Sequence, residues 1–237
     1  MSSQPAADPG ALHRMQIGAF VKARLLQTPN AMQIPANGLD IFVVRSFLTP
    51  ELCRQVIGLI DQDRVPSGLL APTADPEFRT SESCNLRPAD AVNQAVEAQL
   101  NTLMGIQPTH GETIQGQRYA VGQQFKPHHD FVHTTEAYWA DQEKQGGQRT
   151  WTAMIFLNEP EAGGQTYFPQ ANVRVTPRTG NLLAWNNLDA FGQPNPNSLH
   201  TGMPVEAGTK YVITKWYRER PWGWYTGQGA THQTYYS

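Results

Sequence analysis

The second half of the chain consists of short β-prone runs separated by turn residues. From Glu112 onward, Gly, Pro and Asn interrupt stretches that are rich in β-branched and aromatic residues. Frequent turns leave little room for long helices, and runs of this length are typical of strands. The runs lie at about 112–120, 123–129, 149–157, 165–168, 172–176, 181–186, 198–202 and 210–218. Eight short strands predict a closed or double-sheet β architecture, a jelly-roll or cupin-like barrel around a central cavity.

Helical patterns fill the first half of the chain, and we expect them to support this β core. Asp8-Pro9 predicts the start of an amphipathic helix and Thr28-Pro29 its end. Its apolar stripe is Leu12, Met15, Ala19, Ala23 and Leu26. A strand at 40–46, a helix that begins after Thr49, and a third helix at about 88–104 follow.

These patterns predict a mainly β protein with flanking helices, in the α+β class. We divide the chain into an N-terminal extension with one amphipathic helix (1–36), helical support (37–110), a jelly-roll core (111–220) and an aromatic, glycine-rich tail (221–237). The small, polar residues 1–8 are expected to be disordered. The first helix is expected to pack on the domain, and the alternative is that it joins two copies in a homodimer.

Composition excludes several classes of protein. The formal charge is −2 and no Lys/Arg block occurs, so neither nucleic acid nor an anionic membrane is an expected partner. Cys53 and Cys84 form no CxxC motif, which argues against a disulfide scaffold and a cysteine zinc site. We find no signal peptide and no stretch of ~20 apolar residues that could span a membrane. We therefore expect a cytoplasmic protein.

The run Gln115–Asp130, QGQRYAVGQQFKPHHD, contains the strongest chemical signal. Side chains alternate along a strand, so His128 and Asp130 share one face of an extended segment. His129 takes the opposite face, and we expect both it and His133 to point away from a site built on His128 and Asp130. An HxD pair supplies two metal ligands but is common by chance, so further residues must support it.

His200 and Lys210 provide that support. Two histidines and one carboxylate on adjacent strands form the facial triad typical of non-haem Fe(II) oxygenases, which leaves three coordination positions free. The same ligands also admit Mn, Co or Ni. Lys210, on the strand after His200, would be costly inside a barrel unless paired. A dicarboxylate bound to the metal at one end would place its other carboxylate near such a charge.

Three ordered motifs carry a resemblance to a known family. They are Tyr119-x-x-Gly122-Gln123-x-Phe125-x-x-His128-x-Asp130, then Gly163-Gly164-x-Thr166-x-Phe168-Pro169, then His200-x-Gly202-x-Pro204-Val205 with Lys210 and Lys215-Trp216. Together they resemble the prolyl 4-hydroxylase family of 2-oxoglutarate- and Fe(II)-dependent dioxygenases, over about 40–220.

The resemblance implies a double-stranded β-helix with His128, Asp130 and His200 as iron ligands. It implies that Lys210, Thr166 and Tyr119 bind the distal carboxylate of 2-oxoglutarate, and Trp216 either lines the cofactor pocket or fills the barrel. The implied reaction uses Fe(II), 2-oxoglutarate and O₂, hydroxylates an unactivated C–H and releases succinate and CO₂. Ascorbate is a further candidate cofactor.

The substrate is less well defined. Family members hydroxylate proline in peptides, and a bacterial-type, single-domain enzyme acting on a peptide or protein is our leading interpretation. Candidate substrate residues are Arg79, Glu112, Tyr138 and Trp139, each of which has an ordinary structural alternative such as loop packing or, for Glu112, orienting an arginine. Two other functions stay open: a hydroxylase of a free amino acid or small metabolite, and a non-catalytic cupin-like sensor of metal and organic acid.

Overall fold

The computed structural model describes residues 8, 10–69 and 74–223 of the 237-residue chain. The expectations for residues 1–7 and for the tail beyond 223 lie outside the described residues. In chain order the elements are α1 (Ala11–Gln27), β1 (Ala31–Gln33), β2 (Ile41–Val44), α2 (Pro50–Asp63), β3 (Val65–Pro66), β4 (Glu82–Asn85), α3 (Ala91–Met104), the 3₁₀ turn η1 (Pro108–His110), β5 (Gln115–Tyr119), β6 (Phe125–His128), α4 (Trp139–Lys144), β7 (Arg149–Phe156), β8 (Ala162–Gly163), β9 (Thr166–Phe168), β10 (Val173–Val175), β11 (Leu182–Asn186), the 3₁₀ turn η2 (Pro196–Ser198), β12 (His200–Gly202), β13 (Val205–Ala207) and β14 (Lys210–Arg218).

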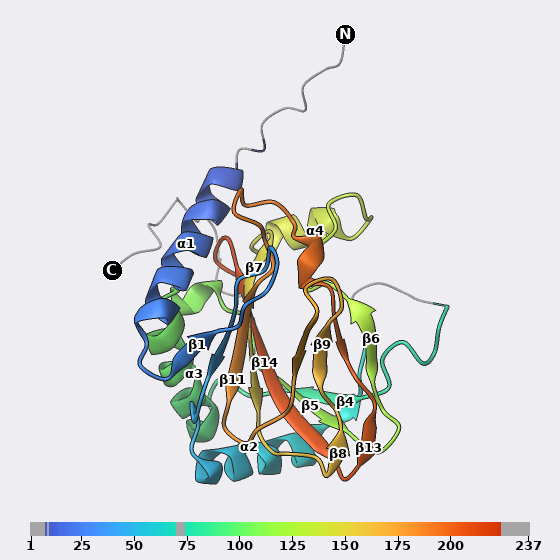
Figure 1. Cartoon of the computed structure of the whole chain (residues 1–237). Coiled ribbons are helices and arrows are strands. Elements are labelled where there is room, and N and C mark those ends of the chain that lie inside the picture. The colour runs from blue at the N-terminus through green and yellow to red at the C-terminus, as the bar shows by residue number, and fades with distance from the viewer. Residues whose placement is uncertain (1–7, 9, 70–73, 224–237) are drawn as a thin grey trace.

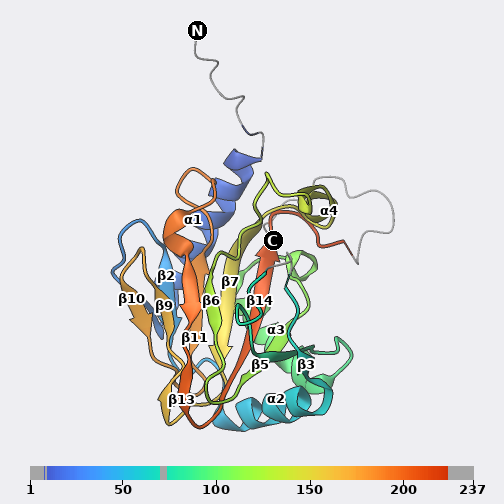
Figure 2. The ribbon, with the colours of Figure 1, turned by 90° about the vertical axis from the view of Figure 1, so that its right-hand side faces the viewer.

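Two main sheets form the β core (Figures 1 and 2). Within the described residues the major sheet has eight strands in the order β1-β2-β11-β7-β14-β5-β4-β3, and the minor sheet has four in the order β10-β9-β12-β6. A short β13-β8 pair lies apart from both in the pairing scheme. Paired strands within the sheets run antiparallel. The double-stranded β-helix predicted from the sequence is confirmed.

Successive side chains on each strand of the major sheet point to opposite faces, and each face is covered by its own hydrophobic core. On β7, Trp151, Ala153 and Ile155 pack on the helix side, in one cluster with residues of α1, α2 and α3. Met154 and Phe156, which alternate with them, belong to the second cluster, between the two sheets. The interior face of the barrel therefore carries the even-numbered residues of β7, Thr152 among them.

Local signals explain where the supporting helices begin and end. Thr49 caps α2 by accepting the backbone N–H of Leu52 at 3.2 Å. Asp90 caps α3, which ends at Gly105 in the left-handed conformation, φ 67°. All eight runs predicted as strands from Glu112 onward contain strands in the structure, whereas the short strands β1, β3, β4, β8 and β13 were not predicted.

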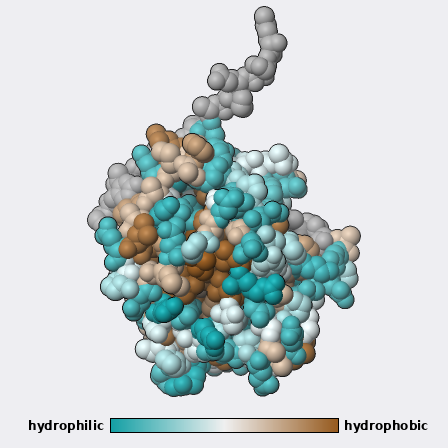
Figure 3. Space-filling model, viewed as in Figure 1, coloured by the Kyte–Doolittle hydropathy of each residue, from teal (hydrophilic) through white to brown (hydrophobic). Residues whose placement is uncertain are grey.

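The buried face of α1 differs from the predicted stripe. The helix packs against α3, β1 and β7 through Ile17, Val21 and Leu25. The predicted stripe residues Leu12 and Leu26 are instead 61% and 58% exposed. Apolar residues occur on both sides of this helix, so spacing alone could not identify the buried one. Apolar surface over the first turns of α1 is visible in Figure 3.

Arg14 explains part of this difference. Its guanidinium is buried and donates to Glu219 at 3.0 Å and to the carbonyl of Gly192 at 2.7 Å. A paired arginine can thus occupy a buried helix face that a hydrophobicity pattern assigns to solvent. The helix also begins later than predicted, with Gly10 rather than Asp8 at the N-cap.

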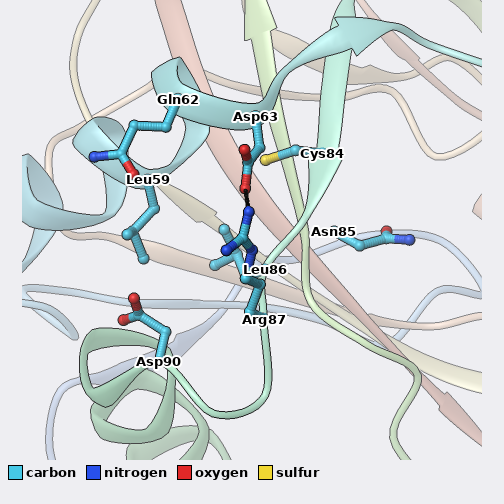
Figure 4. A pocket seen from close by; sticks show the side chains of 8 residues that line it. All are labelled: Leu59, Gln62, Asp63, Cys84, Asn85, Leu86, Arg87 and Asp90. Atoms are coloured by element: carbon cyan, nitrogen blue, oxygen red, sulfur yellow. Dashed lines mark hydrogen bonds and ion pairs between the residues drawn. The ribbon is translucent and has the colours of Figure 1, made fainter.

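A small pocket lies where the end of α2 meets β4 and the start of α3 (Figure 4). An ion pair of 2.7 Å between Arg87 and Asp63 crosses it. The pocket has a volume of about 50 Å³, room for little more than water, and it contains no cluster of metal ligands. We assign it no binding role. No helix among the described residues is long and apolar enough to cross a membrane.

The two neighbouring leucines at the end of α1 provide a test of its packing. Leu25 is fully buried and Leu26 is 58% exposed. Leu25→Ala should lower the free energy of unfolding by about 2–5 kcal/mol because it leaves a cavity. Leu26→Ala should change it by less than about 0.5 kcal/mol. Chemical denaturation of both variants checks this, and a larger loss for Leu26→Ala would contradict the assigned face.

Candidate active site

Strand pairing brings the two candidate histidines together. β12 pairs with β6, and His200 is the direct register partner of His128. Their ring centroids are 4.3 Å apart. Asp130 follows the end of β6, with Oδ1 3.9 Å from Nε2 of His128 and Oδ2 3.9 Å from Nε2 of His200. One ligand atom from each residue lies within 4.8 Å of the others, so the three could hold one metal ion.

Hydrogen bonds to backbone carbonyls fix how both histidine rings are protonated. Nδ1 of His128 lies 2.8 Å from the carbonyl oxygen of Lys126, and Nδ1 of His200 lies 2.9 Å from that of Ser198. A carbonyl only accepts, so each Nδ1 donates its hydrogen, and Nε2 is the ring nitrogen left to bind a metal. Both Nε2 atoms face Asp130, which is the arrangement that metal binding requires.

Burial and neighbouring groups together shift the pKa values of His128 and Asp130. Burial and the neighbouring His200 lower the pKa of His128 to about 3, so this ring is neutral at pH 7. Burial alone would raise the pKa of Asp130, but His200, His128, Arg149 and a hydrogen bond from Thr152 together lower it. The carboxylate is therefore ionised. Two imidazole nitrogens and one carboxylate form a donor set suited to a borderline divalent cation such as Fe(II).

An inner pocket adjoins this cluster inside the barrel. It is lined by the four residues predicted to surround the co-substrate, Tyr119, Thr166, Lys210 and Trp216, and by His128, Asp130 and His200. Lys210 is 2% exposed, and its Nζ lies 5.3 Å from the centroid of the Tyr119 ring. Among the described residues no carboxylate pairs with it, and burial lowers its pKa to about 7.

The polar atoms in this pocket fit a bound carboxylate. The hydroxyl of Thr166 and Nε1 of Trp216 are buried and have no hydrogen-bond partner in the described part of the chain. The Gly163-Gly164 turn, with φ of 74° and 68°, leads into the strand that carries Thr166. A buried ammonium without a counter-ion and unused donors are costly unless a ligand satisfies them. The distal carboxylate of 2-oxoglutarate has that chemistry.

Gln117 is a pocket residue that sequence reasoning missed. Its Oε1 accepts from the hydroxyl of Tyr119 at 2.9 Å, and its Nε2 lies 3.4 Å from the hydroxyl of Thr214. It shares the strand parity of Tyr119 on β5, a signal that could have identified it. Its contact with Tyr119 leaves that hydroxyl already engaged within the protein.

A wider cleft of about 650 Å³ opens outside the cluster. His128 and Asp130 lie in its lining, so the metal ligands face it, and Trp216 lines both this cleft and the inner pocket. Three of the four predicted substrate residues, Arg79, Glu112 and Tyr138, also line it. Trp139 does not line it; it is the first residue of α4, and its role toward a substrate stays a prediction.

Glu112 orients arginines, the alternative that the sequence left open. Arg149 binds it with two hydrogen bonds of 2.6 and 2.7 Å, and Nε of Arg218 lies 2.6 Å from the same carboxylate. Burial would raise the pKa of Glu112, but the two arginines lower it. Arg149 also lies over the Trp216 ring, 4.3 Å from its centroid. No motif in the sequence pointed to Arg149.

Arg79 and the two histidines that were not expected to bind metal, His129 and His133, all line the cleft. Arg79 donates to Oε1 of Gln115 at 2.7 Å and lies over Phe125, 4.7 Å from the ring centroid. Burial lowers its pKa. The rings of His129 and His133 contact Phe131 and each other, and both lie outside the ligand cluster, as strand parity predicted.

The two adjacent histidines of the PHHD motif should differ in metal binding. His128→Ala removes a ligand, and we expect the affinity for Co(II) to fall by more than the roughly 10–100-fold that loss of a supporting partner costs. His129→Ala should leave it within about twofold of the wild-type value. Calorimetric titration of the metal-free proteins measures both. Equal losses for the two variants would contradict the assigned ligands.

From the lowered pKa of Lys210 we predict that the affinity for 2-oxoglutarate falls as pH rises. Only the ammonium form attracts a carboxylate, and the pKa of Lys210 is about 7 in the ligand-free protein. The carboxylates of 2-oxoglutarate stay ionised above about pH 6. The dissociation constant should therefore rise by up to about tenfold per pH unit above pH 7.

Calorimetry on Mn(II)-loaded protein at several pH values measures this dependence. His128 is neutral throughout this range, since its pKa is about 3. Lys210→Met is the control, with weaker binding and little change with pH. An unchanged pH dependence in that variant would show that another group titrates.

Comparison with known proteins agrees with this geometry. The family model of the 2OG-Fe(II) oxygenase superfamily matches residues 114–218. A probable prolyl 4-hydroxylase of Arabidopsis thaliana is 31% identical over 201 residues, covering 74% of this chain and 68% of that protein. A putative prolyl 4-hydroxylase of Acanthamoeba polyphaga mimivirus is 28% identical over 180 residues, covering 76% and 74%.

Solved structures share the fold. The viral collagen prolyl hydroxylase of Paramecium Bursaria Chlorella virus-1, solved as a 2OG complex, superimposes with a TM-score of 0.60 at 24% identity, over 75% of this chain and 95% of that one. A Pseudomonas putida prolyl-4-hydroxylase gives a TM-score of 0.53 at 18% identity, over 86% and 99%. The chain belongs to the prolyl 4-hydroxylase family of the 2OG-Fe(II) oxygenase superfamily.

Proposed function

We propose that this protein hydroxylates proline residues in a peptide or protein, with Fe(II), 2-oxoglutarate and O₂ as its cofactor and co-substrates. One observation carries the proposal: His128, Asp130 and His200 lie between an inner pocket that ends in Lys210 and an outer cleft of about 650 Å³. A site open on both sides can receive a co-substrate and a substrate separately.

Each group in the site then has a task. His128, Asp130 and His200 would hold Fe(II), and Lys210 and Thr166 would bind the distal carboxylate of 2-oxoglutarate. When bound, the iron and 2-oxoglutarate supply the oxidation, and succinate and CO₂ are the by-products. The protein positions the substrate C–H, and buried core residues such as Met154, Trp185 and Val212 complete the lining of the inner pocket.

The outer cleft suits an extended peptide. It is wide and carries aromatic side chains, among them Phe125, Tyr138, Trp216 and Trp222, on which a prolyl ring could stack. Arg79 and Arg149 place N–H donors on the same surface, which suits backbone carbonyls. A prolyl hydroxylase of Trichoplax adhaerens with this fold, at a TM-score of 0.60 and 16% identity, was solved in complex with a hypoxia inducible factor peptide fragment.

Mass spectrometry of a proline-containing peptide library tests the proposal. After aerobic incubation with Fe(II), 2-oxoglutarate and ascorbate, we expect some peptides to gain one oxygen atom on proline. His128→Ala should abolish this gain, because it removes a metal ligand, whereas His129→Ala should retain it.

Free amino acids serve as the competing substrates in the same assay. Succinate release with free amino acids alone would reject the peptide substrate and keep the dioxygenase chemistry. Metal and 2-oxoglutarate binding without turnover of any substrate would instead favour a sensor.

A further inference from the structure

Two buried polar side chains connect Asp130 to the interior of the major sheet. Thr152 lies on the barrel face of β7 and is fully buried; its hydroxyl lies 2.7 Å from Oδ2 of Asp130. Asn187, also fully buried and just after β11, places Nδ2 2.9 Å from the same hydroxyl. Buried polar groups in such a core are costly unless they serve each other.

The direction of these hydrogen bonds follows from the groups involved. A threonine hydroxyl has one hydrogen to donate, and an amide nitrogen can only donate. Asn187 therefore donates to Thr152, and Thr152 donates its single hydrogen to Asp130. An ionised carboxylate accepts two such bonds on each oxygen, so this chain favours the form of Asp130 that binds metal.

We propose that Thr152 and Asn187 are positioning residues that hold the carboxylate of Asp130 for metal binding through a single oxygen. This inference rests on the proposed function, since it concerns the same metal site. Thr152 engages Oδ2 and so makes the two oxygens unequal ligands, with Oδ1 free. A carboxylate bound through both oxygens would occupy one of the positions that 2-oxoglutarate and O₂ need.

The backbone of Asn187 extends the same support to the second histidine. Its N–H donates to the carbonyl of Thr150 at 2.8 Å, and its carbonyl accepts from the N–H of Asn195 at 3.0 Å. The carbonyl of Asn195 accepts from the hydroxyl of Ser198 at 2.8 Å. Ser198 in turn provides the carbonyl that holds Nδ1 of His200. Asn187 therefore contacts both the strand behind Asp130 and the segment that leads to His200.

Metal affinity of full-length variants tests the role of Thr152. Co(II), titrated calorimetrically into metal-free protein, is the probe. Thr152→Val keeps the shape and removes the hydrogen bond, and we expect Co(II) affinity to fall by about 10–100-fold. Thr152→Ser keeps the hydroxyl and should restore affinity to within a few-fold of wild type. Thr150→Val is the matched control, because Thr150 is equally buried on the same face of β7 but donates to the Tyr217 carbonyl instead.

Asn187→Leu tests the second link and keeps the inference testable if Thr152→Val does not fold. If Asn187 acts through the hydroxyl of Thr152, the double variant Thr152→Val/Asn187→Leu should bind Co(II) about as weakly as Thr152→Val alone. Additive losses would contradict that route. Circular dichroism of each variant confirms that it is folded.

The outcomes separate this inference from the proposed function. If the wild type binds Co(II) and the binding depends on His128, but Thr152→Val and Asn187→Leu bind equally well, the positioning role is wrong and the metal site stands. If the wild type binds no Co(II) at this site, the proposed function fails and the positioning role fails with it.

Discussion

The pairing of β6 with β12 is the interaction on which the whole site depends. It places His128 opposite His200, and both rings are held in the same way, by a carbonyl two residues earlier in the chain. Because the same local geometry occurs on two antiparallel strands, both Nε2 atoms converge on Asp130. A shift of one residue in either strand would turn the histidine of that strand to the other face and separate it from its partner.

The major sheet separates two buried environments, and two lysines on β14 show what that separation does. Lys215 lies on the helix face and forms an ion pair with Glu97 of α3 at 2.6 Å. Lys210 lies on the barrel face without a carboxylate partner among the described residues, and burial lowers its pKa to about 7. Lys215 is satisfied within the protein, so its role is structural. Lys210 is buried at a cost that only a ligand can offset.

Sequence reasoning predicted the features that depend on the alternation of side chains along a strand and on turn residues. It failed where contacts between distant segments determine which side chains are buried or brought together. Strand alternation separated His128 and Asp130 from His129, and turn residues located the strands of the core. The buried face of α1 could not be read from spacing, because Arg14 is buried through an ion pair with Glu219, far along the chain. Thr152 and Asn187 carry no motif, and only the register of β7 with β11 brings them together.

Trp216 lines both the inner pocket and the outer cleft, and a network of buried charges lies next to it. Arg149 and Arg218 are register partners on neighbouring strands, where like charges repel. The carboxylate of Glu112 binds both and balances this repulsion. Removing Glu112 would leave two like charges buried side by side without their shared carboxylate, which is far more costly than replacing all three groups together. Arg149 also lies over the ring of Trp216, which lines both spaces, so this ion network supports a side chain that the cleft and the Lys210 pocket share.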